Sequence, residues 1–325
     1  MDKITTIGLD LAKQVFHVVG FDARGKEVRK KMLRRSQVLS FFAQLPACQI
    51  GMEACAGAHH WARQLQQLGH QVRLIPAQHV RAYVQGNKND YNDARAIAEA
   101  MSRPRMRFVP VKTVAQQDVQ ALHRLRQGCL KDRTALANRL RGVLGEYGIV
   151  LPKGVALLRR RLPELLEQPD NGLSEELRRL LAQGYQRLRE LDAHIEAYTH
   201  QVHTQARQSP PCQRLQRLPG YGPILASAFH GQVGDGHGYR RGRDVSAASG
   251  LVPRQHSSGG KPTLLGISKR GDRYLRALLV HGARSVVRQA ARKDDPLSRW
   301  INRIRAERGF NKAAVAMANK MARMG

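Results

Sequence analysis

The sequence predicts an α/β domain at the N-terminus, then a long helical region and a second, mainly helical domain. In residues 1–110, short β-branched and apolar runs alternate with helical segments. From Thr113 to Tyr147 there is no proline, and apolar residues recur at helical spacing. A polar, proline-containing break follows at 208–211. We therefore predict domains at 1–110, 111–207 and 208–325.

The first domain has a recognisable order of elements. Strands are predicted at 4–9, 15–21, 26–33, 49–52 and 71–75, and helices at 36–45, 58–68, 77–85 and 92–101. A turn at 22–25 joins the second and third strands, so the first three strands form an antiparallel meander. Three strands followed by alternating helices and strands are the order of the ribonuclease H-like fold.

The rest of the chain reads as helical. Amphipathic helices are predicted at 113–147, 155–166 and 174–206, and the two long ones suggest an α-hairpin or coiled coil used for self-association. The last domain contains short helices, a glycine-rich segment at 231–242, a loop at 253–266 and three helical stretches.

The composition indicates a polyanionic partner. The 325 residues include 55 Lys and Arg against 25 Asp and Glu, a formal net charge of +30. Aromatic residues make up only 5%, so base stacking is not expected to dominate binding. The four cysteines form no Cys-x-x-Cys pair, which argues against a zinc or redox site. With no signal peptide or membrane-spanning run, we expect a cytoplasmic, nucleoid-associated protein without a membrane partner.

Four acidic residues stand out against this positive charge. Asp10 and Glu53 fall at the ends of predicted strands, while Asp90 and Asp93 lie one helical turn apart at a predicted helix start. Singly, Asp10 could start a turn, and the Asp90–Asp93 pair could be a helix capping box. Their joint order favours a site for Mg²⁺ or Mn²⁺ beside nucleic-acid phosphates.

Two C-terminal motifs are less specific. Gly220 and Gly222 form a Gly-x-Gly hairpin between predicted helices, which suits phosphate binding in a helix-hairpin-helix element or simply a tight interhelical turn. The Ser257-Ser258-Gly-Gly loop is a phosphate-binding turn, a nucleophile site or a flexible turn. Spacing alone does not choose a nucleophile there.

Three N-terminal motifs resemble a known family. The stretches GLDLAK at 8–13, MEACAG at 52–57 and KNDYNDARAI at 88–97 resemble the DEDD transposases of insertion-sequence family 110, the last in the wording of its subgroup 1111. The N-terminal half of that family is similar to RuvC Holliday-junction resolvases. The resemblance implies that Asp10, Glu53, Asp90 and Asp93 are the catalytic, metal-binding tetrad.

The C-terminal half resembles the same family. Gly-Leu-x-Pro-Arg followed by Ser-Gly matches its second block, whose serine attacks DNA; this implies Ser258 as the nucleophile, with Ser257 as the competitor. The residues expected at nucleic acid are Gly220, Gly222, Arg254, Lys261, Lys269, Arg270, Arg273 and Arg276.

The resemblance also implies an activity. It is that of an RNA-guided DNA recombinase or transposase, in which a structured guide RNA (a bridge RNA) pairs with donor and target DNA. A homodimer or homotetramer and a phosphoserine intermediate are implied with it. Two alternatives are a metal-dependent junction nuclease that uses water, and a non-catalytic nucleic-acid-binding protein.

Overall fold

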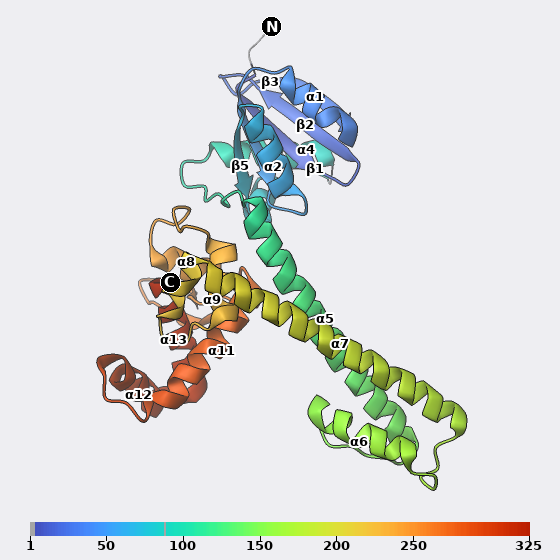
Figure 1. Cartoon of the computed structure of the whole chain (residues 1–325). Helices are drawn as coiled ribbons and strands as arrows, with labels where there is room; N and C mark the ends of the chain where they lie inside the picture. Colours follow the sequence, from blue (N-terminus) through green and yellow to red (C-terminus); the bar gives the residue numbers. More distant parts are fainter. Residues whose placement is uncertain (1–3, 88) are drawn as a thin grey trace. The chain divides into compact units, whose positions relative to one another are not determined.

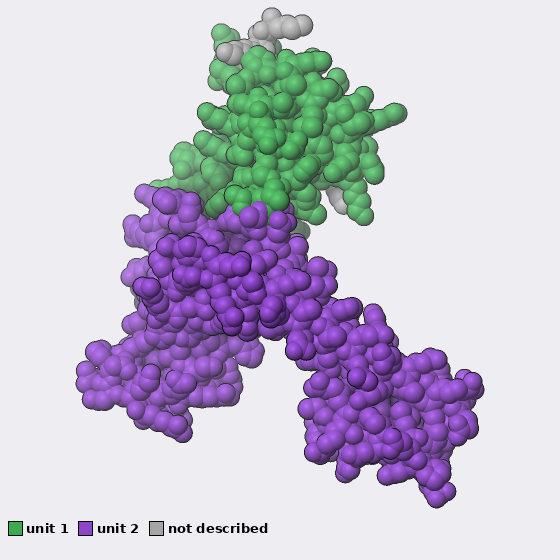
Figure 2. All heavy atoms as spheres, viewed as in Figure 1, with its two compact units in different colours: residues 1–114 green, residues 115–325 purple. Residues whose placement is uncertain are grey.

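The computed structural model describes residues 4–87 and 89–325 of the chain. The chain divides into two compact units, Met1–Val114 and Ala115–Gly325 (Figure 2). Among the described helices, none combines the length and apolar character needed to cross a bilayer.

A five-stranded mixed sheet organises the first unit (Figure 1). Its strands are β1 (Thr6–Leu11), β2 (Val15–Phe21), β3 (Glu27–Arg34), β4 (Gln49–Glu53) and β5 (Gln71–Ile75). Their order is β3-β2-β1-β4-β5. Strands β1, β2 and β3 pair antiparallel, whereas β4 is parallel to β1 and β5 is parallel to β4. The prediction of an α/β N-terminal domain is confirmed, and the topology is consistent with a DEDD nuclease-like fold.

Alternation along the strands sends apolar side chains to one face. The 3-10 turn η1 (Arg35–Gln37) and helices α1 (Val38–Ala43) and α2 (Ala58–Gln67) belong to this face. Ile7 and Leu9 of β1 join Phe16 of β2 and Trp61 of α2 in one buried core. The Phe16 and Trp61 rings meet edge to face with their centroids 5.0 Å apart.

Helix α4 (Asp90–Ser102) packs on the opposite face of the sheet. A smaller core there joins Ile75 of β5 to Ile97 and Met101 of α4. Before it come α3 (Ala77–Val80) and the 3-10 turn η2 (Arg81–Tyr83). The single helix predicted over 77–85 is therefore wrong: the chain turns extended at Val84, and this short segment buries only Val80.

The second unit begins with long helices. They are α5 (Val114–Glu146), α6 (Val155–Glu167) and α7 (Glu175–Gln208). Leu140 and Leu144 of α5 share a buried cluster with Leu158 of α6 and Leu181 of α7. The Ser174 side chain caps α7 by accepting a hydrogen bond from the Leu177 amide. The helices predicted at these places are confirmed; their assembly as a coiled coil stays a prediction.

A helical bundle completes the second unit. It contains α8 (Pro210–Gln216), α9 (Pro223–Val233), α10 (Gly242–Ala248), α11 (Arg273–Ala290), α12 (Pro296–Arg308) and α13 (Phe310–Met324). Their apolar faces form one core around Phe229, Leu279 and Met317. Between α10 and α11 lies a β-hairpin, β6 (Pro253–Gln255) and β7 (Leu264–Ile267), where the sequence predicts only a loop.

Candidate active site

Two glycines bring α4 onto the sheet. Gly8 of β1 and Gly51 of β4 face each other in register. A Cβ on Gly8 would stand 1.8 Å from the Ala94 carbonyl oxygen, and one on Gly51 would stand 3.0 Å from Ile97 Cγ2. Only glycine therefore allows α4 to approach this closely. The contact positions the first turn of α4 over the ends of β1 and β4.

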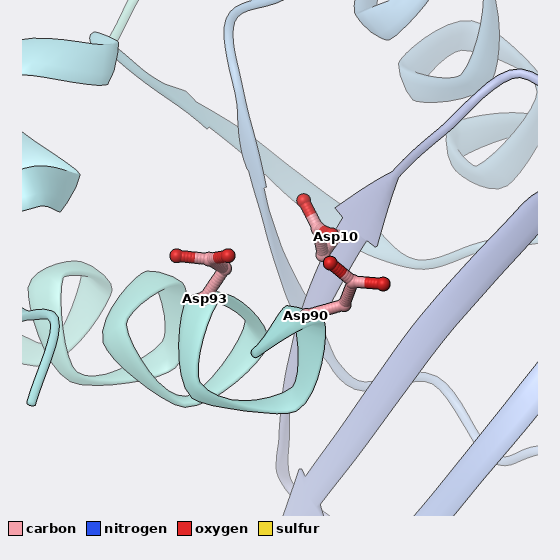
Figure 3. A group of neighbouring side chains, drawn as sticks. All are labelled: Asp10, Asp90 and Asp93. Carbon is pink, nitrogen blue, oxygen red and sulfur yellow. The ribbon is translucent and has the colours of Figure 1, made fainter. Parts of the chain in front are cut away.

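Three of the predicted carboxylates meet at this point. Asp10 is two residues after Gly8 and shares its face of the sheet, where Asp90 and Asp93 project from the first turn of α4 (Figure 3). One oxygen of each lies within 4.8 Å of the others. Asn89, and not Asp90, is the N-cap: its side chain accepts a hydrogen bond from the Tyr91 amide. The capping-box alternative for the aspartates is therefore wrong.

Glu53 lies beside this group of three. It follows Met52, which pairs with Leu9 just before Asp10, so the parallel register carries Glu53 toward Asp10. Glu53 is not within the 4.8 Å group of oxygens. It is close enough, however, for the charge of Asp93 to contribute, after burial, to raising its pKa.

Burial and repulsion by neighbouring carboxylates raise the pKa of Asp10. The pKa of Asp10 is raised from 3.8 to about 6, first by burial and then by the negative charges of Asp93 and Asp90, in that order of importance. Only His17 opposes the shift. A cluster of hard carboxylate oxygens that repel one another is relieved by a divalent cation, so the donor set fits Mg²⁺ or Mn²⁺. Asp10, Asp90 and Asp93 would hold it.

The sequence reasoning missed the partners of this cluster. His17, opposite Asp10 on β2, brings its Nδ1 to 3.5 Å from Asp90 Oδ2. The His17 ring also meets Tyr91 edge to face, with the ring centroids 4.7 Å apart. Lys30 of β3 places its Nζ 4.2 Å from the centre of the Tyr91 ring. A strand pairing of this kind has no spacing signature, so only the predicted meander could have suggested His17.

The serine candidates lie at the tip of the β6–β7 hairpin. Gly259 and Gly260 have φ of 57° and 75°, and the Lys261 amide donates to the Ser258 carbonyl oxygen at 3.1 Å. Two positive φ angles in a two-residue turn define a type I′ hairpin, which requires residues such as glycine. The tip is exposed to solvent.

The two serines differ in their hydroxyl groups. The Ser257 Oγ accepts hydrogen bonds from the Thr263 amide at 3.1 Å and from Gln255 Nε2 at 2.9 Å. Within residues 4–87 and 89–325, no hydrogen bond to the Ser258 hydroxyl is formed. The Ser257 side chain thus links the two arms of the hairpin, whereas the hydroxyl of the exposed Ser258 makes no hydrogen bond within the described part of the chain.

The predicted nucleic-acid residues divide into two groups. Most of the predicted cations are exposed around the hairpin and the start of α11: Arg254, Lys261, Lys269, Arg270 and Arg273. Arg276 is different, because its Nη1 donates to the carbonyl oxygens of Ser249 at 3.0 Å and Arg270 at 3.4 Å. It therefore holds the loop before α11 against the end of α10.

The glycine pair occupies the turn between α8 and α9. Gly220 has φ of 84°, and a Cβ there would stand 2.7 Å from Met321 Cε and 3.0 Å from the Gly282 carbonyl oxygen. Packing alone thus explains Gly220. Gly222 has open space around it and precedes Pro223 at the start of α9. Phosphate binding by this turn stays a prediction.

A mixed sheet with clustered acids, in a chain of net charge +30, is typical of enzymes that act on DNA. Comparison with known proteins identifies the family. Residues 7–149 match a DEDD transposase signature of IS110, and residues 212–296 match the Transposase IS116/IS110/IS902 family. The chain belongs to the IS110 family of transposases, as the motifs predicted.

Relatives from several bacteria support this membership along the whole chain. A probable family 20 transposase of Pseudomonas aeruginosa is 48% identical over 99% of this chain and 96% of its own length. The transposase for insertion sequence element IS1111A of Coxiella burnetii is 46% identical over 99% of this chain and 88% of its own. The transposase for insertion sequence element IS1328 of Yersinia enterocolitica is 42% identical over 100% of this chain and 96% of its own length.

Proposed function

We propose that this transposase is a DNA recombinase that cuts and exchanges strands by attack of the Ser258 hydroxyl on a phosphodiester, at a site completed by the acidic tetrad. The observation that carries the proposal is the convergence of Asp10, Asp90 and Asp93 oxygens within 4.8 Å. Three carboxylates from a strand and a helix, gathered in a chain of net charge +30, have an evident role beside a polyanion.

Each residue has a defined part in the reaction. Asp10, Asp90 and Asp93, with Glu53 beside them, would hold a divalent cation, which when bound offsets the negative charge that builds on phosphate oxygens. The Ser258 oxygen forms a bond to phosphorus while the bond to the leaving strand breaks, and the serine proton passes to solvent or a nearby base. The phosphoserine linkage retains the energy of the broken phosphodiester bond. The hydroxyl of a second strand can therefore displace the serine without a high-energy cofactor.

The order of steps separates this mechanism from the nuclease alternative. A nuclease would use water as the nucleophile and would leave no protein–DNA bond. Ser258 is exposed on an ordered turn, which supports the serine mechanism over the water mechanism. A water mechanism would not require a serine at this position. The non-catalytic alternative gives no reason for three carboxylates to crowd together at an energetic cost.

The partners follow from the same proposal. We propose that donor and target DNA are recognised through a structured guide RNA, so that base pairing supplies the sequence specificity. The exposed cations around the hairpin then serve phosphates. We further propose that α5 and α7 mediate a homodimer or homotetramer, that the middle and C-terminal parts are separate domains meeting near residue 207, and that the protein works at the nucleoid.

A matched pair of variants tests the nucleophile. Labelled DNA carrying the element junction is incubated with Mg²⁺ and the full chain purified together with its bound RNA, and covalent adducts are resolved on a denaturing gel. We expect Ser258→Ala to abolish both adduct and strand exchange, and Ser257→Ala to retain the adduct at reduced yield because the hairpin loosens. Cleavage by Ser258→Ala at the wild-type rate would establish the water mechanism instead.

A second experiment tests the guide. Protein purified from its native host under mild conditions should carry one discrete RNA transcribed from the element's own flanks. Sequencing of the bound RNA checks this. Recovery of only fragmented bulk RNA would refute RNA guidance without affecting the serine mechanism.

A further inference from the structure

We propose that the DNA strand being cut runs along the α4-facing side of β3, where Lys30, Met32 and Arg34 form a row that we call the β3 track, with the Tyr91 ring beside it. The inference rests on the proposed function and assigns it a binding surface. The ligand is a nucleic-acid strand, bound through its phosphates and bases at the nucleotides next to the scissile phosphate.

Strand register places the track beside the carboxylates. Asp10 pairs with His17, and His17 pairs with Met32. Directly paired residues point to the same face, so Asp10, His17 and Met32 form one line across three strands. Lys30 and Arg34 are two residues before and after Met32 and share its face. The β3 track therefore lies two strands away from β1, the strand that carries Asp10.

Side-chain contacts make the surface continuous. His17 Nδ1 is 3.5 Å from Asp90 Oδ2, and the His17 and Tyr91 rings pack edge to face. The Tyr91 ring also contacts Lys30, whose Nζ lies 4.2 Å from the ring centre. Tyr91 is the residue after Asp90, so the ring stands directly between the acidic cluster and the β3 track.

The chemistry of the row suits a nucleic-acid strand. Lys30 and Arg34 are exposed cations, and Met32 between them is itself 55% exposed. A strand-binding surface combines backbone-neutralising cations with apolar or aromatic faces against which bases rest. An exposed methionine between two cations has no benefit for solubility.

The opposite face of β3 provides an internal control. Arg29 and Lys31 point to the other side, where both lie over the Phe41 ring of α1, at 6.0 Å and 5.1 Å. Lysines on an edge strand commonly protect it against pairing with another chain. That role would engage the two faces alike, whereas strand binding next to the carboxylates needs only the face of Lys30.

Salt-dependent binding tests the track. The affinity of the full chain for a labelled single-stranded DNA is measured by fluorescence anisotropy at several salt concentrations, with chelator present. Because log K falls with log salt, each lost phosphate contact should decrease the steepness of that fall by about 0.7. We expect this decrease for Lys30→Ala and for Arg34→Ala, and no decrease for Lys31→Ala. Equal decreases for Lys30→Ala and Lys31→Ala would overturn the proposal.

Two further variants test the ring and the location. Tyr91→Ala should weaken binding roughly fivefold to a hundredfold, while Tyr91→Phe keeps the ring and should bind normally. A photo-crosslinking amino acid in place of Met32 should attach to nucleotides adjacent to the cleavage site. Crosslinks only to distant nucleotides, or to a protein instead of DNA, would refute the placement.

These measurements separate the two proposals. Binding in chelator needs no chemistry, so it can fail while Ser258→Ala still abolishes the adduct; the track is then wrong and the recombinase stands. Conversely, an active Asp10→Asn variant with a normal adduct would refute the proposed catalytic site, whatever the salt slopes of the Lys30 and Lys31 variants.

Discussion

Replacement of Asp10 by asparagine should stabilise the metal-free protein while destroying its site. The folded state raises the pKa of this carboxyl from 3.8 to about 6, first through burial and then through the charges of Asp93 and Asp90. At about 1.36 kcal/mol per pKa unit, ionising Asp10 at neutral pH costs about 3 kcal/mol. Because the group is partly exposed, solvent screening reduces this to about 1–2 kcal/mol.

The sign of the pH dependence follows from proton binding. Between pH 4 and 6 the folded protein holds this proton more tightly than the unfolded chain does, so stability falls as the pH rises through that window. Urea unfolding at pH 5 and pH 7.5, with chelator, measures the effect. We expect Asp10→Asn to exceed the wild type by about 1–2 kcal/mol at pH 7.5 and by less at pH 5.

A control and a cation titration complete the experiment. Glu99→Gln removes the same charge from the far end of α4, where Glu99 pairs with Arg103 on the surface, and should change stability by less than about 0.5 kcal/mol. Mg²⁺ should stabilise the wild type at pH 7.5 more than it stabilises Asp10→Asn. If Asp10→Asn is no more stable than the wild type in chelator, burial and the neighbouring charges do not penalise the ionised Asp10 carboxylate and the reasoning fails.

Three other substitutions have defined outcomes. Gly8→Ala would place a Cβ 1.8 Å from the Ala94 carbonyl oxygen and should cost about 3 kcal/mol or more in urea unfolding. His123 is buried, and its pKa is lowered to about 4, first by that burial. Its contribution to stability is therefore present above pH 6.5 and lost as the pH falls toward 4, so His123→Phe should lose less stability than the wild type between pH 6.5 and pH 4. Gly260→Ala, at φ of 75°, should cost about 1–2 kcal/mol locally and speed proteolysis of the hairpin, whereas Gly266→Ala has open space and should not.

Much of the first unit follows from its sequence pattern. Alternating apolar residues locate β2 and β4 closely, and the meander follows from the turn at 22–25. The first strand is predicted at 4–9 but runs from Thr6 to Leu11, because pairing with β2 continues through Asp10. That extension places Asp10 inside a paired strand, where its direction is fixed by the sheet.

The remaining features depend on contacts between distant residues. The β6–β7 hairpin has exposed strands, so no apolar alternation marks it, although the Gly259–Gly260 pair was a usable turn signal. His17 and Lys30 become site residues only through strand pairing and the docking of α4. Sequence motifs identify the four acids, but they carry no information about the side chains that surround those acids in the folded protein.

The contact between Gly8 and α4 links folding to activity in one further way. Because Asp90 and Asp93 reach Asp10 only while α4 rests on the glycines, a displacement of that helix would spread the three acids apart even with the sheet intact. Warming, or any bulky substitution beneath the helix, would then inactivate the enzyme while its circular dichroism still looked native.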